Sequence, residues 1–133
     1  MASIFSRIVA GEIPCYKIAE NDDFLAFLDV SPVAYGHALV VPKQEIDYIF
    51  DLDDALLADM MLFAKQVARA LRQVVPCARI GVSVIGLEVP HAHVHLIPIN
   101  RLADMDFAGP RVVVAAEEQA ALAAKVAVFF ADL

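Results

Sequence analysis

Three of the four histidines of this chain, His91, His93 and His95, occupy alternate positions in one apolar segment. In an extended strand successive side chains point to opposite faces, so the three imidazoles are expected on one face, with Ala92 and Val94 on the other. Aligned imidazoles are poor packing groups, because each needs hydrogen-bond partners and has a pKa near neutrality. The pattern therefore predicts a catalytic row of histidines.

The chemistry that suits this row is nucleophilic attack on phosphorus. A neutral imidazole is present at pH 7 and attacks without first losing a proton, and the resulting phosphohistidine passes its phosphoryl group to water. In a strand, the flanking histidines stand about 6.6 Å from the central one, close enough to orient it or to contact phosphate oxygens. His93 is therefore the predicted nucleophile, and His91 and His95 are the predicted helpers.

Two other interpretations of the histidines stay open. Zinc favours imidazole ligands, but positions i and i+4 of a strand lie about 13 Å apart, so one ion hardly binds both His91 and His95. A zinc-dependent hydrolase would instead combine His91 and His93 with His37 or a carboxylate. In the structural alternative, the rings lie in the core and bind backbone carbonyls.

Composition narrows the class of protein. The formal net charge of −7 and the absence of a basic run argue against nucleic-acid binding. No apolar stretch reaches the roughly 18 residues that a membrane span needs, and residues 1–7 lack the features of a signal peptide. Two cysteines make no disulfide framework, so we expect a cytoplasmic protein with no membrane partner. The apolar fraction of 60% leads us to expect a homodimer.

Periodicity and turn signals predict three helices and five strands within one domain spanning residues 1–133. The helices are expected at residues 3–9, from Asp51 or Asp53 to about 75, and at 116–130; the strands at 16–19, 24–29, 37–41, 79–85 and 91–99. Strands that follow one another with helices inserted predict an α+β fold with an antiparallel sheet.

The segment His91–Ile97 resembles the His-φ-His-φ-His-φ-φ motif of the histidine triad (HIT) family. Three other segments resemble the family in the same order along the chain, so that the match runs from about residue 4 to residue 99; they are Ile4–Pro14, Phe24–Pro32 and Gly36–Lys43. The resemblance is to the small Hint-like branch of homodimeric nucleotide hydrolases and transferases. It implies a five-stranded antiparallel sheet per subunit, with the two sheets joined across the dimer.

The resemblance also implies an activity. Its substrates would be purine nucleoside 5′-phosphoramidates, aminoacyl-adenylates or dinucleoside polyphosphates, cleaved through a covalent nucleotidyl-histidine intermediate without a metal or other cofactor. His93 matches the nucleophile, and His95 matches a donor to phosphate oxygen. The backbone carbonyl of His91 would fix the tautomer of the nucleophile, and His37 matches a fourth histidine near the phosphate. Asp29 matches the carboxylate that accepts from the ribose hydroxyls.

Four residues match the apolar wall around the base, namely Phe5, Ile8, Phe27 and Val30. Plain core packing is the alternative for the two phenylalanines and Val30. Aromatic and branched side chains suit a purine face, as a carboxylate suits a vicinal diol.

The chain departs from the family pattern in three places. Leu87 stands where a glutamine is usual and the preceding asparagine is absent, so Ser83 is expected to substitute only in part as a nucleotide-binding residue. Ile99 replaces a basic residue after the triad strand. Ser3 and Ser6 occupy the positions of a zinc-binding cysteine pair found in some bacterial members, so no zinc is predicted. The missing amides leave open a nucleotide-binding regulator with little catalysis.

Overall fold

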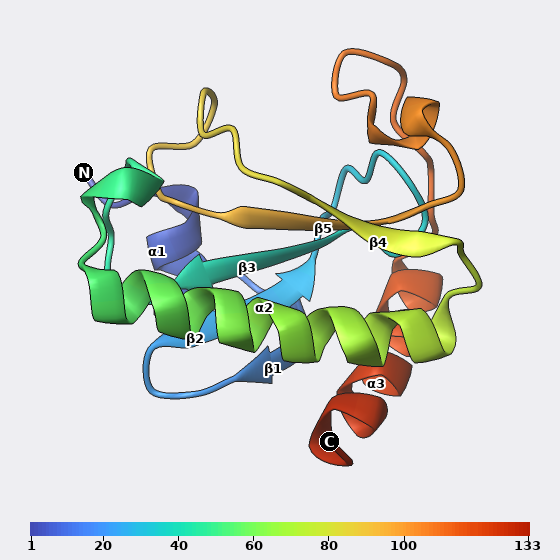
Figure 1. Cartoon of the computed structure of the whole chain (residues 1–133), viewed down its shortest axis with the longest axis horizontal. Helices are drawn as coiled ribbons and strands as arrows, with labels where there is room; N and C mark the ends of the chain where they lie inside the picture. Colours follow the sequence, from blue (N-terminus) through green and yellow to red (C-terminus); the bar gives the residue numbers. More distant parts are fainter.

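The computed structural model describes all 133 residues and contains one antiparallel sheet in the order β1-β2-β3-β5-β4 (Figure 1). The strands are β1 (Tyr16–Glu20), β2 (Phe24–Leu28), β3 (Ala38–Pro42), β4 (Arg79–Ser83) and β5 (Val94–Ile99). The expected α+β class and five-stranded antiparallel sheet are thus confirmed.

The three expected helices are also present. Helix α1 (Ile4–Val9) begins after Ser3, whose hydroxyl accepts from the backbone N–H of Ser6, and α2 (Asp54–Val74) begins after Asp53, whose carboxylate caps Leu56. Helix α3 (Ala116–Ala131) packs against α2 and β1. Two 3₁₀ turns, η1 (Ile49–Asp51) and η2 (Leu102–Met105), were not anticipated from the pattern. None of the helices combines the length and apolar character that crossing a bilayer requires.

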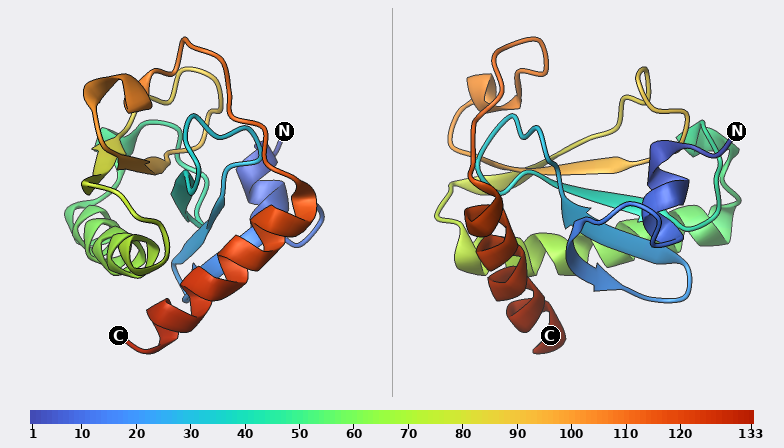
Figure 2. Two further views of the ribbon diagram at one scale, coloured as in Figure 1. Left: turned by 90° about the vertical axis from the view of Figure 1, so that its right-hand side faces the viewer. Right: turned by 180° about the vertical axis from the view of Figure 1, so that it is seen from behind.

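The central strands bury both faces. In β2, Phe24, Ala26 and Leu28 join the larger core, which also contains side chains from α2 and α3, whereas Leu25 and Phe27 join a smaller cluster. That smaller cluster includes Phe5 of α1, so α1 covers the face opposite to α2, as the view from behind in Figure 2 shows. One face of β2 therefore packs in the larger core beneath α2 and α3, whereas the other face packs against the short helix α1.

The histidine segment is less regular than the alternating pattern predicts. Strand β5 begins at Val94, so His91 and His93 precede it instead of lying within it. The backbone N–H of His91 donates to Val89 O, and that of Ala92 donates to Ile46 O, so neither group joins the sheet. The expected strand at 79–85 likewise ends at Ser83, and the strand expected from His37 begins at Ala38.

Candidate functional site

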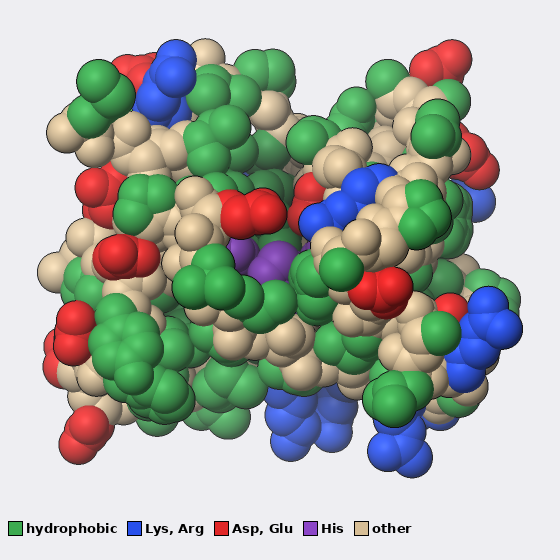
Figure 3. All heavy atoms as spheres, turned by 90° about the horizontal axis from the view of Figure 1, so that it is seen from above, with side chains coloured by type: hydrophobic (Ala, Val, Ile, Leu, Met, Phe, Trp, Pro, Cys, Tyr) green, Lys and Arg blue, Asp and Glu red, His purple; other side chains and the backbone are tan.

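A cleft of about 450 Å³ opens on the face that carries α1. Figure 3 shows histidine side chains at the bottom of this hollow, with acidic and basic side chains near its rim. Its volume lies in the range of small-molecule sites, which are mostly apolar with a few polar groups. The lining residues are Ile4, Phe5, Asp29, Leu39, Ile85, Gly86, Leu87, Glu88, Val89, His93, His95, Phe107, Ala108 and Arg111.

The hydrogen bonds of His93 determine its tautomer. Its Nδ1 lies 2.7 Å from the backbone oxygen of His91, and because a carbonyl oxygen only accepts, Nδ1 carries the proton. The other nitrogen, Nε2, makes no hydrogen bond within the chain. Every buried side-chain nitrogen of the chain has a hydrogen-bond partner, so Nε2 is not buried and is accessible. In its neutral form, His93 therefore presents an unprotonated nitrogen to the cleft, as a nucleophile requires.

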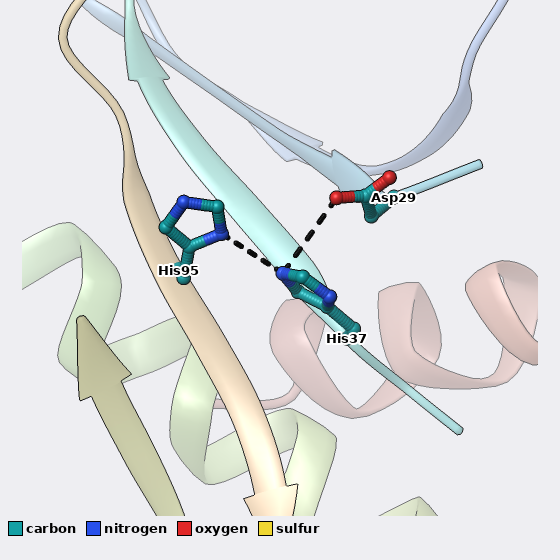
Figure 4. A group of neighbouring side chains, drawn as sticks. All are labelled: Asp29, His37 and His95. Atoms are coloured by element: carbon teal, nitrogen blue, oxygen red, sulfur yellow. Dashed lines mark hydrogen bonds and ion pairs between the residues drawn. The ribbon is translucent and has the colours of Figure 1, made fainter. Parts of the chain in front are cut away.

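The hydrogen bonds of His37 and His95 form a second ordered chain. The backbone N–H of Val33 donates to His37 Nδ1 over 3.1 Å, so the proton of the neutral His37 ring is on Nε2. That Nε2–H donates to His95 Nδ1 over 2.9 Å (Figure 4). His95 consequently carries its own proton on Nε2, which makes no hydrogen bond within the chain and is accessible. His95 thus offers a donor to a bound ligand.

Burial keeps these two rings neutral. Desolvation lowers the pKa of His37 to about 3 and that of His95 to about 4. Asp29 Oδ2 lies 3.7 Å from His37 Nε2, beyond hydrogen-bonding distance, and Asp29 Oδ1 accepts from the Ser31 backbone over 2.8 Å. Burial raises the pKa of Asp29. The carboxylate lines the cleft, where it accepts hydrogen bonds from hydroxyl groups.

His91 contributes its backbone and not its ring. The ring Nε2 donates to Pro42 O over 2.7 Å, so Nδ1 accepts from the Ser3 hydroxyl over 2.8 Å. Glu45 accepts from the Ser3 backbone and, over 2.7 Å, from the Ser6 hydroxyl; these bonds lower the pKa of Glu45 to about 2. The ring is fully buried, and burial lowers its pKa. The amino-terminal cap of α1 therefore holds the carbonyl that orients His93.

One group of side chains has donor atoms close enough to share a metal ion, namely Asp29, His37 and His95, within 4.8 Å of one another. This group differs from the expected zinc set of His91, His93 and His37, because both ring nitrogens of His91 are already hydrogen-bonded. A metal on the observed group would have to replace the hydrogen bond between His37 and His95.

The structure brings only part of the predicted site to the cleft. Phe5, Asp29, His93 and His95 line it, whereas His37 and His91 lie behind those that do. Four predicted nucleotide-binding residues are not among the lining residues: Ile8 and Phe27, which pack in the smaller cluster, Val30, which is 78% exposed, and Ser83, which pairs with His95 in the sheet.

Several lining residues were missed. Residues 85–89 all line the cleft. Because they directly precede the histidine segment in the sequence, their position could have indicated that they lie near the site. Phe107, Ala108 and Arg111 come from the connection between η2 and α3, where no periodicity or motif marks them. The ring of Phe107 contacts His95 with its centroid 4.8 Å away, so this connection forms one wall of the site.

Comparisons with known proteins agree with this fold. A family model described as HIT domain matches residues 10–102. An adenosine 5′-monophosphoramidase of Schizosaccharomyces pombe is 38% identical over 99 residues, which cover 74% of this chain and 74% of that protein. The structure of a Hit-like protein involved in cell-cycle regulation from Bartonella henselae has a TM-score of 0.82 and 26% identity, covering 96% of this chain and 95% of that one. A hypothetical histidine triad nucleotide-binding protein from Sulfolobus tokodaii also has a TM-score of 0.82 and 26% identity, covering 97% and 92%.

Proposed function

Because this chain belongs to the HIT family, we propose that it is a nucleotide hydrolase or transferase acting at the α-phosphorus of purine nucleoside 5′-phosphoramidates or dinucleoside polyphosphates. The observation that carries the proposal is the tautomer of His93, whose Nδ1 is bound to the His91 carbonyl over 2.7 Å while Nε2 is free. The name of the fission-yeast relative, an adenosine 5′-monophosphoramidase, supports the phosphoramidate class.

In the proposed reaction, His93 Nε2 attacks the α-phosphorus and forms a P–N bond. The bond to the leaving nitrogen or oxygen breaks, and the leaving group departs with the electron pair; a leaving amine takes its proton from solvent. The nucleotidyl-histidine carries a positive charge that the His91 carbonyl dipole stabilises. Water then attacks phosphorus and loses a proton, which releases the nucleoside monophosphate and restores neutral His93.

The other residues bind and orient the nucleotide in this proposal. The Nε2–H of His95, held by its bond to His37, donates to a non-bridging phosphate oxygen, where negative charge develops during attack. Asp29 accepts from the ribose hydroxyls, and Phe5 and the apolar side chains beside it contact the purine.

The decisive experiment compares wild type with His93→Ala on adenosine and guanosine phosphoramidates and on diadenosine polyphosphates. Turnover is expected to disappear in the variant, while adenosine monophosphate still binds. A radiolabelled nucleotide should also be trapped on the wild-type protein, but not on the variant, when the reaction is quenched without acid. Hydrolysis by His93→Ala at the wild-type rate would refute the proposal.

A second candidate function is a nucleotide-binding regulator with little catalysis. It is favoured by Leu87, which lines the cleft and is 88% exposed but whose side chain offers no hydrogen bond to a phosphate or to water. Tight binding of adenosine monophosphate, combined with no turnover of any substrate in the panel, would favour this candidate over the hydrolase.

We also propose that the whole chain acts as one domain within a homodimer. Strand β4 is an edge strand, and its Val82 side chain is 52% exposed. Just beyond the end of β4, Ile85 is 44% exposed. An unpaired edge of this kind is suited to pairing with a second copy. Sedimentation should therefore give a dimer mass, and Val82→Lys should give a monomer.

A further inference from the structure

The cleft contains a single full positive charge. Among its lining residues Arg111 is the only Lys or Arg, whereas Asp29 and Glu88 are both carboxylates. The histidine His95 does not compensate, because its ring stays neutral at pH 7. A nucleotide phosphate therefore enters a cleft in which two carboxylates face one guanidinium. Among the Lys and Arg residues of the chain, only Arg111 lines the cleft and can contact that phosphate there.

Arg111 belongs to a part of the chain beyond residue 102, where the match to the family model ends. This segment is held against the loop that follows β2, since Val112 N–H donates to Pro32 O over 2.9 Å. The guanidinium donates to Ser31 O and to Phe107 O, both over 3.4 Å. Its position is therefore set by contacts with the same loop that carries Asp29.

The guanidinium of Arg111 has hydrogen-bonding capacity to spare. It takes part in none of the ion pairs of the chain, and its two hydrogen bonds to carbonyl oxygens are long. It lies 5.9 Å from the centroid of the Phe107 ring, which in turn contacts His95. With five N–H donors and no carboxylate partner, it is suited to bind phosphate oxygens.

We propose that Arg111 binds the α-phosphate of the nucleotide together with His95, and so supplies a charged contact to the reacting group from outside the matched family region. This inference rests on the proposed function for the identity of the ligand. The nearness of Arg111 to the site has electrostatic support. Its charge contributes to lowering the pKa of His37 and of His95, and it opposes the burial that raises the pKa of Asp29.

The test measures the binding of adenosine, adenosine monophosphate and adenosine diphosphate by calorimetry and needs no turnover. Arg111→Gln should weaken binding of adenosine monophosphate about tenfold, because a hydrogen bond to a charged group is lost, and should leave binding of adenosine unchanged. The loss should shrink as salt is raised. Arg111→Lys should retain part of the affinity. The matched control is Arg101→Gln, since Arg101 lies just before η2 and pairs with Asp104 but does not line the cleft.

Three outcomes would overturn the assignment. Equal weakening of adenosine and adenosine monophosphate would mean that Arg111 only supports the fold of its segment. Weakening of adenosine diphosphate alone would place the guanidinium at the next phosphate. Unchanged binding of all three ligands would remove Arg111 from the site. The two proposals can fail separately. If Arg111→Gln weakens binding of adenosine monophosphate but the wild type hydrolyses no substrate, the hydrolase is refuted and this inference is supported.

Discussion

His37 Nε2 lies 2.9 Å from His95 Nδ1, and this buried hydrogen bond determines which nitrogen of His95 faces the cleft. Because Val33 N–H already occupies the other nitrogen of His37, the direction of donation is settled by the backbone. Removing the donor at His37, a residue that does not line the cleft, should therefore alter the donor that His95 presents to a phosphate.

The lowered pKa values of His37 and His95 predict a loss of stability in mild acid. Unfolded histidine takes up a proton near pH 6.5, whereas the folded rings resist protonation until about pH 3 and about pH 4. As the pH falls below 6.5 the unfolded state binds more protons, so the free energy of unfolding decreases. The stabilisation is complete above pH 6.5. Urea unfolding of wild type between pH 7.5 and 4.5 measures this decrease.

His37→Gln is the control for the pH effect, because glutamine can still donate to His95 but does not titrate. Its free energy of unfolding should lie below that of wild type at pH 7.5, and the gap should narrow toward pH 4.5. A gap that stays constant over this range would show that His37 is not the titrating group.

Ser3 caps α1 and also donates to the ring of His91. Ser3→Ala should cost about 1 kcal/mol of stability for the lost cap and should lower kcat, because the His91 carbonyl that orients His93 becomes less constrained. Asp53→Ala removes the cap of α2 and should cost a similar amount, with kcat unchanged. Equal effects of the two variants on kcat would separate Ser3 from the catalytic geometry.

Gly36 adopts a φ of +88°, and a Cβ at this position would lie 3.0 Å from Pro98 Cγ and 3.0 Å from Val75 Cγ2. Gly36→Ala combines left-handed backbone strain of roughly 1–2 kcal/mol with this crowding, next to His37. Gly86 has a φ of +77° with no atom within 4 Å of a Cβ, so Gly86→Ala should cost the strain alone. Chemical denaturation should rank Gly36→Ala as the less stable variant, and the reverse order would contradict the packing argument.

A metal ion should inhibit this protein. The Asp29, His37 and His95 group would bind zinc only by giving up the bond between the two histidines, which holds the His95 donor in place. Turnover should therefore survive treatment with a chelator and fall when zinc is added in excess. Loss of activity in chelator, restored by stoichiometric zinc, would instead support a zinc-dependent hydrolase.

Much of the site follows from local sequence patterns. The alternation with apolar residues predicted that His93 and His95 share a face, and both line the cleft, while Val94 and Leu96 lie in the larger core. The same alternation placed His91 on that face, but its ring is fully buried and does not line the cleft. It did not predict where the strand begins, because that depends on Ala92 bonding to Ile46, a residue distant in the sequence.

The remaining differences also arise from tertiary contacts. Val30 follows Asp29 directly, but its side chain is 78% exposed and does not line the cleft. Phe107 and Arg111 lie in a connection without periodicity, and only the fold back onto the Pro32 loop brings them to the cleft. Such contacts leave no local pattern that a single sequence reveals.

The α3 residue Gln119 donates from Nε2 to the backbone oxygen of Asp29 over 2.9 Å. A nascent chain leaving the ribosome therefore acquires all four histidines well before it acquires the contact that ties α3 to the Asp29 loop. The site should therefore be complete only after α3 has been synthesised and has folded back onto the Asp29 loop.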